Sequence, residues 1–386
     1  MSETILVYRD RIVPRSEAHF LRRLYIGFEH LMPVWIGRHA GDGLADLGVE
    51  PLFLGRPGML GTVDRARFKQ FGTLPPVPDL RALHPRLVHA HFGRGGALSL
   101  PIARAIGVPL VVTYHGGDAT KDKHYRRGLV PTIYQRRLAA LQRETALFIC
   151  VSDFIRDQLL ARGFPPEKLL VHHYGVELDA TENPADPPNP AEPPYALFAG
   201  RFVEKKGIGF LIEAMRRLEG EGVDLRLKLI GDGAIAGDLK RQAAGLKSVS
   251  FPGWIANRDL RRAMRGALAV CVPSVQAANG DAEGLPNVVI EAMACGAPIV
   301  ATHHAGIGEA VEDGRSGILV PSGDATALTA ALRRLAAEPG TARAMGLAGR
   351  RVALERFDAT AQSRRLEAIL SDVIARSAAT KQSPSD

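Results

Sequence analysis

Two carboxylates in the second half of the chain are spaced as a ligand site would require. Glu283 ends the polar loop that starts at Gln276, and Glu291 follows about two helical turns later. Pro286 predicts the start of a helix between them, because proline is favoured at a first helical position. A helix N-terminus presents unpaired backbone N–H groups and a partial positive charge, both suited to a phosphate. The segment therefore offers donors for an anion and two acceptors for hydroxyl groups.

A turn further upstream supplies positive side chains. The segment Gly200 to Gly207 (GRFVEKKG) follows a predicted strand and precedes a predicted helix. Arg201 can grip phosphate oxygens through its forked guanidinium, whereas Lys206 acts as a point charge. A charged surface turn would explain the same residues without a ligand. A solvent-facing loop and helix would likewise explain the two glutamates.

His115 stands in the sequence TYHGGD, at the carboxyl end of an apolar strand of the first half. A histidine at this position can belong to a functional site or have a structural role. We interpret His89 and His91, in the sequence VHAHFG, as structural, with His91 also a candidate cleft residue. Gly231 and Gly233 end another strand as Gly-Asp-Gly, a signal that any sharp turn could produce.

In their order along the chain, these segments resemble the retaining glycosyltransferases with the GT-B fold. The glutamate spacing resembles the family's E-x7-E pattern, GRFVEKKG resembles its G-R-x-x-x-x-K-G signature, and TYHGGD resembles its T-x-H-G-x-D. The loop NGDAEGLP resembles the colanic-acid and exopolysaccharide subgroup. The first loop, residues 9–20, departs from the commoner family pattern because it lacks a Gly-Gly turn, so Arg15, Ser16 and Glu17 receive no role.

The resemblance implies roles for these residues. Arg201 and Lys206 would hold the donor diphosphate, and His115 would contribute to catalysis beside the donor sugar. Glu283 would bind the sugar hydroxyls, and Glu291 would bind the nucleotide ribose. The remaining residues of the predicted donor site are Gly231, Gly233, Gly284 and Leu285.

Strand and helix signals alternate through both halves of the 386-residue chain, which predicts an α/β protein with parallel sheets. The expected GT-B architecture has two Rossmann-like domains facing a central cleft. Six prolines between 182 and 194 predict a stiff linker. The predicted boundaries are 1–181 for the acceptor-side domain, 182–194 for the linker, 195–356 for the nucleotide-sugar domain, 357–375 for a helix crossing back, and 376–386 for a flexible tail.

A formal charge of +8 permits an anionic partner, and many basic residues cluster between 121 and 143. A helix over 132–148 with arginines beside an apolar face predicts contact with an anionic membrane surface, although a solvated face is equally compatible. The basic segment lacks interleaved aromatic residues, which argues against nucleic acid. No apolar run approaches a membrane span and the N-terminus lacks a signal-peptide layout, so we expect a cytoplasmic or peripheral membrane protein.

The resemblance implies transfer of a sugar from a nucleoside diphosphate to a hydroxyl of a lipid-linked oligosaccharide or polysaccharide precursor, with retention. UDP is the base expected from the subgroup. The chain contains no D-x-D pattern, so we expect no metal, and the donor is a substrate with no further cofactor. Two alternatives stay open, a GT-B-like sugar-nucleotide epimerase and a non-catalytic nucleotide-sugar-binding protein.

Overall fold

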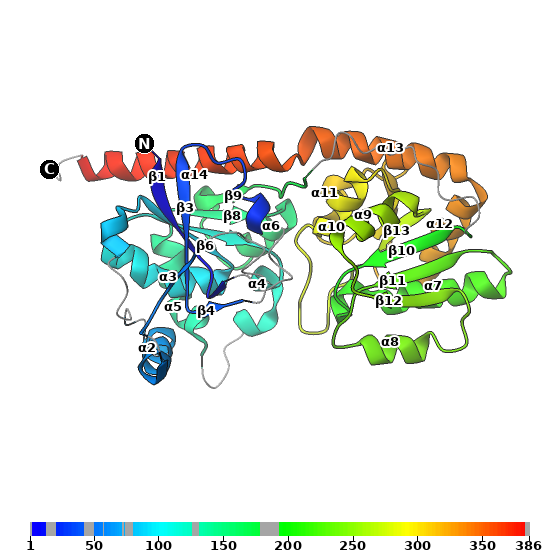
Figure 1. Cartoon of the computed structure of the whole chain (residues 1–386), viewed down its shortest axis with the longest axis horizontal. Coiled ribbons are helices and arrows are strands. Elements are labelled where there is room, and N and C mark those ends of the chain that lie inside the picture. Colours follow the sequence, from blue (N-terminus) through cyan, green and yellow to red (C-terminus); the bar gives the residue numbers. More distant parts are fainter. Residues whose placement is uncertain are drawn as a thin grey trace. The chain divides into compact units, whose positions relative to one another are not determined.

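The chain divides into two compact units, which are shown in the computed structural model of Figure 1. Unit 1 comprises Met1–Gly175 and Ala359–Asp386, and unit 2 comprises Val176–Asp358. The structure describes residues 2–12, 21–41, 50–56, 58–71, 73, 80–125, 131–177 and 193–382. Most of the predicted linker, residues 13–20 of the first loop and residues 126–130 of the basic segment lie outside these ranges.

In the described part of unit 1, seven strands form one parallel sheet. In spatial order they are β5 (Leu52–Phe53), β3 (Leu31–Gly37), β1 (Glu3–Tyr8), β6 (Leu87–His91), β7 (Leu110–Tyr114), β8 (Leu147–Cys150) and β9 (Leu169–Val171). The inner strands β6 and β7 are buried along their whole length, as expected for a sheet covered on both faces. A short parallel pair, β2 (Arg11–Ile12) with β4 (His39–Ala40), lies outside this sheet.

Helices and 3-10 turns accompany these strands. The α-helices are α2 (Gly58–Phe71), α3 (Gly93–Ile106), α4 (Gly117–Thr120), α5 (Ile133–Glu144), α6 (Asp153–Leu160) and α14 (Ala359–Gln382), and the 3-10 turns are η2 (Leu80–Leu83), η3 (Asp122–His124) and η4 (Pro166–Lys168). Thr132 caps α5 through a capping box with Gln135, and Ser152 caps α6 by accepting from the backbone N–H of Ile155. The helix predicted over 132–148 ends at Glu144, because β8 begins at Leu147.

Unit 2 repeats this architecture with six parallel strands in its described residues. In spatial order they are β12 (Val249–Gly253), β11 (Arg226–Ile230), β10 (Tyr195–Ala199), β13 (Ala269–Val272), β14 (Ile299–Thr302) and β15 (Gly317–Val320). The helices are η5 (Glu204–Lys206), α7 (Ile208–Gly220), α8 (Ala236–Gln242), α9 (Asn257–Gly266), α10 (Asn287–Ala294), α11 (Ile307–Ala310), α12 (Ala325–Ala337) and α13 (Pro339–Arg356). Phe198, Leu211 and Leu332 belong to the core that joins the sheet to these helices.

Both sheets reverse their strand order beside the first strand of the unit. The reversal lies between β1 and β6 in unit 1 and between β10 and β13 in unit 2. In such doubly wound sheets, loops diverge at the reversal and leave room for a ligand beyond the carboxyl ends of the strands. The predicted pair of Rossmann-like parallel sheets is confirmed.

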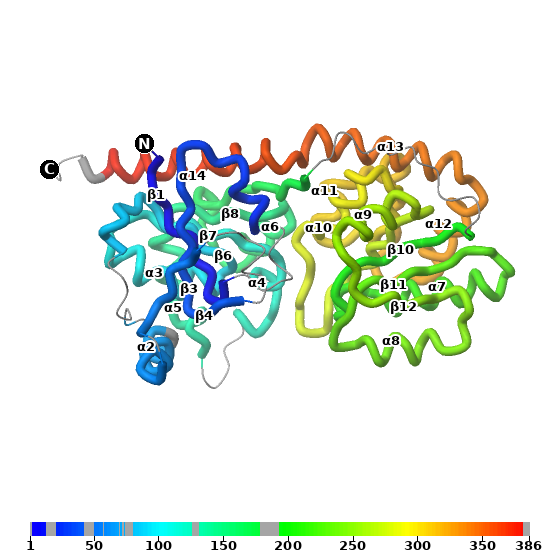
Figure 2. The backbone as a smooth tube through the Cα atoms, in the orientation of Figure 1, coloured from blue at the N-terminus to red at the C-terminus, as the bar shows by residue number. Residues whose placement is uncertain are grey.

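The last helix belongs to unit 1, although it is separated in sequence from the rest of that unit. Figure 2 shows α14 beside the N-terminal strands of unit 1. The Ser363 hydroxyl accepts from the Gly27 backbone N–H and donates to the Leu24 carbonyl, each at 2.9 Å. The Glu367 carboxylate accepts from the backbone N–H groups of residues 29, 30 and 31 at 2.6–3.0 Å. These bonds tie the helix to the segment that leads into β3.

The flexible tail predicted for 376–386 is wrong for residues 376–382, which continue α14. Arg376 pairs with Asp372 one turn earlier at 2.7 Å, and the Thr380 hydroxyl donates to the Arg376 carbonyl. Such contacts between residues four apart support a helix without tertiary packing. Composition alone did not reveal them.

We expect Glu367→Ala to lower the free energy of unfolding by about 2–4 kcal/mol, because it leaves several backbone N–H groups of residues 29–31 without an acceptor. Arg364→Ala is the matched control on the same helix. It removes an exposed ion pair with Glu29, which should contribute less than about 1 kcal/mol. Chemical denaturation of the full chain measures both changes. Equal effects of the two substitutions would contradict this account of how α14 is anchored.

Candidate functional site

In unit 2, the turn after β10 and the loop after β13 meet at one edge of the sheet. They meet because β10 and β13 are neighbours in a parallel sheet, so their carboxyl ends lie side by side. Gly207 makes the contact possible. Its φ is +63°, and a Cβ there would lie 1.8 Å from the Pro273 carbonyl oxygen. Only glycine satisfies both conditions.

The loop from 274 to 286 is bonded to η5 by its backbone. The Val275 N–H donates to the Lys205 carbonyl at 2.9 Å, and the Ala278 N–H donates to the Glu204 carboxylate at 2.9 Å. Within the loop, the Ala277 N–H donates to the Asp281 carbonyl at 2.9 Å. These hydrogen bonds hold the loop against η5 without the help of a ligand.

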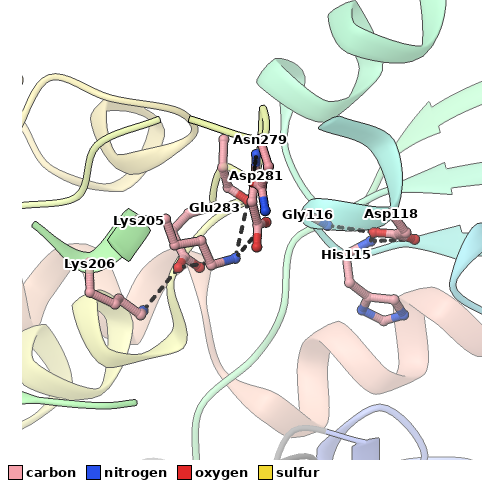
Figure 3. Close-up of polar contacts among 9 residues, drawn as sticks. His115, Gly116, Asp118, Lys205, Lys206, Asn279, Asp281 and Glu283 are labelled. Atoms are coloured by element: carbon pink, nitrogen blue, oxygen red, sulfur yellow. Dashed lines mark hydrogen bonds and ion pairs between the residues drawn. The ribbon is translucent and has the colours of Figure 1, made fainter. Parts of the chain in front are cut away.

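Two lysines of η5 converge on Glu283, as Figure 3 shows. Lys206 Nζ lies 3.2 Å and Lys205 Nζ 3.4 Å from Glu283 Oε1. Lys205 also reaches Asp281 at 3.2 Å and the Ala282 carbonyl at 3.3 Å. All these side chains retain only 11–16% of their surface exposed. Such an enclosed charge cluster requires mutual pairing, because unpaired charges would be costly to remove from water.

Glu283 stays ionised in this setting. Burial on its own would raise the pKa of its carboxyl, but Lys206 and Lys205 outweigh that effect and lower the pKa to about 2. Glu283 is therefore an acceptor at every pH near neutrality. Lys205 was missed by sequence reasoning, because adjacent lysines in a turn give no signal that distinguishes the buried one from its neighbour.

The other predicted donor-site residues occupy different settings. Arg201 is exposed in the same turn, and its side chain has no ion-pair partner among the described residues. Leu285 is buried, and the Gly284 carbonyl accepts from the Gly306 N–H at 2.8 Å. Glu291 lies half-buried in the second turn of α10. This helix begins at Asn287, with Pro286 as its N-cap, one residue later than predicted.

Gly231 and Gly233 have a packing role in this structure. A Cβ at Gly231 would lie 1.9 Å from the Gly200 carbonyl oxygen, and one at Gly233 would lie 2.3 Å from the Phe202 carbonyl oxygen. The Phe202 N–H donates to the Asp232 carbonyl at 2.8 Å. The Gly-Asp-Gly turn is therefore pressed against the turn that carries Arg201, and it helps to position that turn.

In unit 1, Asp118 shapes the turn that carries His115. Its carboxylate accepts from the backbone N–H groups of His115 at 3.0 Å, Gly116 at 2.8 Å and Gly93 at 3.1 Å. Burial raises the pKa of Asp118, and these backbone donors oppose that rise. The bond to Gly93 joins the turn after β7 to the first residue of α3, which follows β6.

The His115 ring is half-buried and is held at both nitrogens. Nε2 lies 3.1 Å from His91 Nδ1, and Nδ1 is hydrogen-bonded to the Tyr174 hydroxyl. Its ring centroid lies 4.3 Å from that of Phe92. Burial, with Arg9 and His89 nearby, holds the pKa of His115 well below its usual range. His115 is thus a neutral imidazole at physiological pH.

These two sets of residues offer different chemistry. The unit 2 set combines a permanent anion, Glu283, with the cations Lys206 and Arg201, which suits sugar hydroxyls and phosphate oxygens. The unit 1 set offers a neutral imidazole that donates one hydrogen bond and accepts another. Within the described ranges, no group of three or more histidine, cysteine, aspartate or glutamate side chains is placed to hold a metal ion. The three cysteines are buried and unpaired with one another.

Comparison with known families agrees with the fold. A model described as Glycosyltransferase Family 4 matches residues 61–180, and one described as Glycosyl transferases group 1 matches residues 193–338. The chain is 32% identical over 298 residues to the amylovoran biosynthesis glycosyltransferase AmsK of Erwinia amylovora, a match that covers 72% of this chain and 70% of AmsK. It is 34% identical over 254 residues to Escherichia coli WcaL, provisionally named a colanic acid biosynthesis glycosyltransferase, covering 64% of this chain.

The chain spans only 60% of the length of that WcaL and 59% of the WcaL of Salmonella typhimurium. Among solved structures, Anabaena HepE in complex with UDP and glucose is similar with a TM-score of 0.77 at 19% identity. The match covers 96% of this chain and 100% of HepE. The predicted GT-B fold class is confirmed.

Gly207→Ala tests how the two loops of unit 2 are brought together. We expect it to lower the free energy of unfolding of unit 2 by about 3 kcal/mol or more, from backbone strain and the clash with Pro273. Gly220→Ala at the end of α7 is the control, because nothing lies within 4 Å of its added Cβ. That control should change stability by no more than about 1 kcal/mol. A Gly207→Ala protein as stable as the control would refute the assigned contact.

Proposed function

Because the chain belongs to the group 1 glycosyltransferases, we propose that it transfers a sugar from a UDP-linked donor to a hydroxyl of a lipid-linked oligosaccharide or polysaccharide precursor. AmsK and WcaL, named for exopolysaccharide biosynthesis, support the class of acceptor. HepE, solved with UDP and glucose, supports the base. A mycobacterial relative at 29% identity is named as dependent on GDP-mannose, which makes GDP the base to test beside UDP.

The observation that carries this proposal is the convergence of Lys206 and Lys205 on Glu283, beside the exposed Arg201. Breaking the bond between sugar and diphosphate leaves negative charge on the diphosphate, and that charge must be stabilised where it develops. Lys206 and Arg201 lie on one turn and supply two cations for this purpose. Glu283, ionised and rigidly held, supplies an acceptor for sugar hydroxyls.

Lys205 has a different part in this arrangement. Its Nζ is already directed at Asp281, the Ala282 carbonyl and Glu283, and only 8% of the residue is exposed. We propose that Lys205 holds the loop in place and that Lys206 contacts the donor. Glu291 on α10 is proposed to bind the nucleotide ribose. Gly284 and Leu285 are proposed to line the donor site between these two glutamates.

We propose that transfer retains the anomeric configuration and needs no metal ion. In such a reaction the acceptor hydroxyl attacks on the face from which the diphosphate departs, and a phosphate oxygen takes the proton. Lys206 and Arg201 would then stabilise the charge on the diphosphate, as a bound metal does in metal-dependent enzymes. Turnover should therefore survive treatment with a chelator. The His115 turn of unit 1 is proposed to contact the donor sugar.

Replacement of the paired charges should slow turnover strongly while the fold persists. We expect Lys206→Ala and Glu283→Gln each to reduce the rate of sugar transfer by about 100-fold to 1,000-fold. Lys247→Ala, which removes an exposed lysine of the same unit, should leave the rate unchanged. The assay follows transfer from a panel of UDP and GDP sugars to a lipid-linked acceptor.

Incubation with donor alone separates the proposal from its rivals. An epimer formed without acceptor would indicate an epimerase, and thermal stabilisation by the donor without any turnover would indicate a binding protein. Near-normal rates in the Lys206 and Glu283 variants would disprove the site assignment.

We further propose that unit 1 docks on an anionic membrane surface. Met59, Leu60 and Phe71 of α2 are 88%, 58% and 72% exposed. Arg136 of α5 donates to Gln70 of α2 at 3.3 Å, so these exposed apolar side chains belong to a helix that lies beside the basic one. An apolar face next to cations is the combination that favours anionic lipid. Arg137 is engaged by the Ala97 carbonyl at 2.7 Å and is assigned no lipid contact.

No described helix is both long and apolar enough to span a bilayer. The contact that we propose is peripheral. We expect the full chain to sediment with vesicles containing phosphatidylglycerol and not with pure phosphatidylcholine vesicles. The double variant Met59→Ser/Leu60→Ser should reduce this binding several-fold, whereas Leu354→Ser, at an exposed position of unit 2, should not. Equal binding to neutral and anionic vesicles would argue against the proposal.

A further inference from the structure

His115 is one end of a continuous row of hydrogen-bonded side chains inside unit 1. Among the described residues, the row begins at Thr113, whose Oγ1 lies 2.7 Å from His89 Nε2. The Tyr25 hydroxyl lies between two histidines, 2.8 Å from His89 Nδ1 and 2.8 Å from His91 Nε2. His91 Nδ1 then lies 3.1 Å from His115 Nε2, and His115 Nδ1 is hydrogen-bonded to the Tyr174 hydroxyl. The row crosses β7 and β6 and reaches Tyr25, which precedes β3, and Tyr174, at the end of the first segment of unit 1. We call it the histidine row.

The interior of the histidine row is sealed from water. His89 and His91 are 0% exposed, and the Trp35 ring is stacked on His91 at a centroid distance of 6.1 Å. Burial lowers the pKa of His89 to about 3, with a smaller contribution from His172. Burial, His89, His115 and Arg9 hold the pKa of His91 well below its usual range. All three imidazoles of the row are therefore neutral.

Because the three rings are neutral, the number of hydrogen atoms available to the row is known. A neutral imidazole carries one N–H and one bare nitrogen, and a hydroxyl carries one O–H. Each hydrogen bond of the row requires one hydrogen atom between its two heavy atoms, and two hydrogen atoms would clash there. If His91 donates toward His115, then Tyr25 must donate to His91, His89 to Tyr25 and Thr113 to His89. If His91 donates toward Tyr25, the Tyr25 hydroxyl must donate to His89, because this buried hydroxyl has no other acceptor among the described residues, and every member then donates in the opposite direction.

We propose that the histidine row has only two arrangements of its protons, and that it thereby sets the tautomer of His115 from a distance. In the first arrangement His89, His91 and His115 all carry their hydrogen on Nδ1, and in the second all three carry it on Nε2. A change at either end reverses every hydrogen bond between them. His91, Tyr25 and His89 are then positioning residues for His115.

The Thr113 end of the row selects between the two arrangements. In the Nδ1–H arrangement the Thr113 hydroxyl donates to His89. In the Nε2–H arrangement it must find another acceptor, and Thr113, which is 3% exposed, has none among the described residues. A buried hydroxyl without an acceptor costs about 1–3 kcal/mol. The resting protein should therefore hold the Nδ1–H arrangement.

Tyr174, which is 5% exposed, forms the other end of the row. In the Nδ1–H arrangement, His115 donates to the Tyr174 oxygen, so the hydrogen of that hydroxyl points out of the row. A ligand oxygen that accepts from Tyr174 stabilises this arrangement, whereas a ligand group that donates to Tyr174 competes with His115. This consequence rests on the proposed function, because it assumes that substrate reaches the His115 turn. The coupling of the three tautomers does not depend on the proposed function.

The coupling is tested by nuclear magnetic resonance on the full chain labelled with ¹⁵N-histidine, where ring ¹⁵N shifts distinguish the two neutral tautomers. We expect His89, His91 and His115 all to be Nδ1–H tautomers at neutral pH, each resonance being assigned by its loss in a single histidine-to-glutamine variant. Three Nε2–H rings would overturn the assigned direction. Any mixed set would overturn the coupling itself.

Tyr25→Phe interrupts the row by removal of one oxygen, and it should free His89 and His91 to take different tautomers. Tyr134→Phe is the matched control, because it removes another buried hydroxyl of unit 1, bonded to Tyr114 and Tyr125 outside the row. We expect Tyr25→Phe to lower kcat about tenfold or more with KM unchanged, and Tyr134→Phe to alter neither. Unchanged tautomers and kcat in a folded Tyr25→Phe protein would refute the proposal. Absence of turnover in the wild-type chain would refute the proposed function, while the tautomer result would still stand.

Discussion

The buried contacts of Lys205 are the interaction on which the unit 2 site depends. One ammonium group holds Asp281, the Ala282 carbonyl and Glu283 against η5, and so joins the turn after β10 to the loop after β13. A charge so enclosed is tolerated only because it is paired with two carboxylates and donates to Asp281 and to the Ala282 carbonyl. The contact in turn keeps Glu283 ionised and fixed, and Lys206 lies against the same carboxylate. The exposed Arg201 is then the least constrained member of the set.

The two units solve the same positioning problem with different chemistry. Each places its candidate residues at the carboxyl ends of adjacent parallel strands, β6 and β7 in unit 1 and β10 and β13 in unit 2. Unit 2 holds its residues with paired charges, which suits recognition of a charged diphosphate. Unit 1 holds His115 with neutral hydrogen bonds in a dry interior, which suits control of a proton. The difference follows from what surrounds each strand end, since Trp35 and Tyr25 exclude water in unit 1.

Glycine determines how closely the loops of unit 2 approach one another. Gly207 admits the Pro273 carbonyl, and Gly231 admits the Gly200 carbonyl. In both cases the nearest atom is protein backbone. A glycine in a motif of this kind therefore need not mark a place where a ligand comes close. Its first effect is to bring together the turns that carry the polar side chains.

The sequence alone determined the two parallel-sheet units, the turn that carries Arg201 and Lys206, and the loop that carries Glu283, because these depend on local periodicity, glycine and proline. Only the tertiary structure decided that Lys205 is the buried partner of Glu283 and that His89, His91 and His115 form one row. Those contacts join strands and loops that are far apart in the chain, so no local pattern reports them. The helical end of α14 was also missed, because composition does not report the Arg376–Asp372 ion pair and the Thr380 hydrogen bond that join residues four apart.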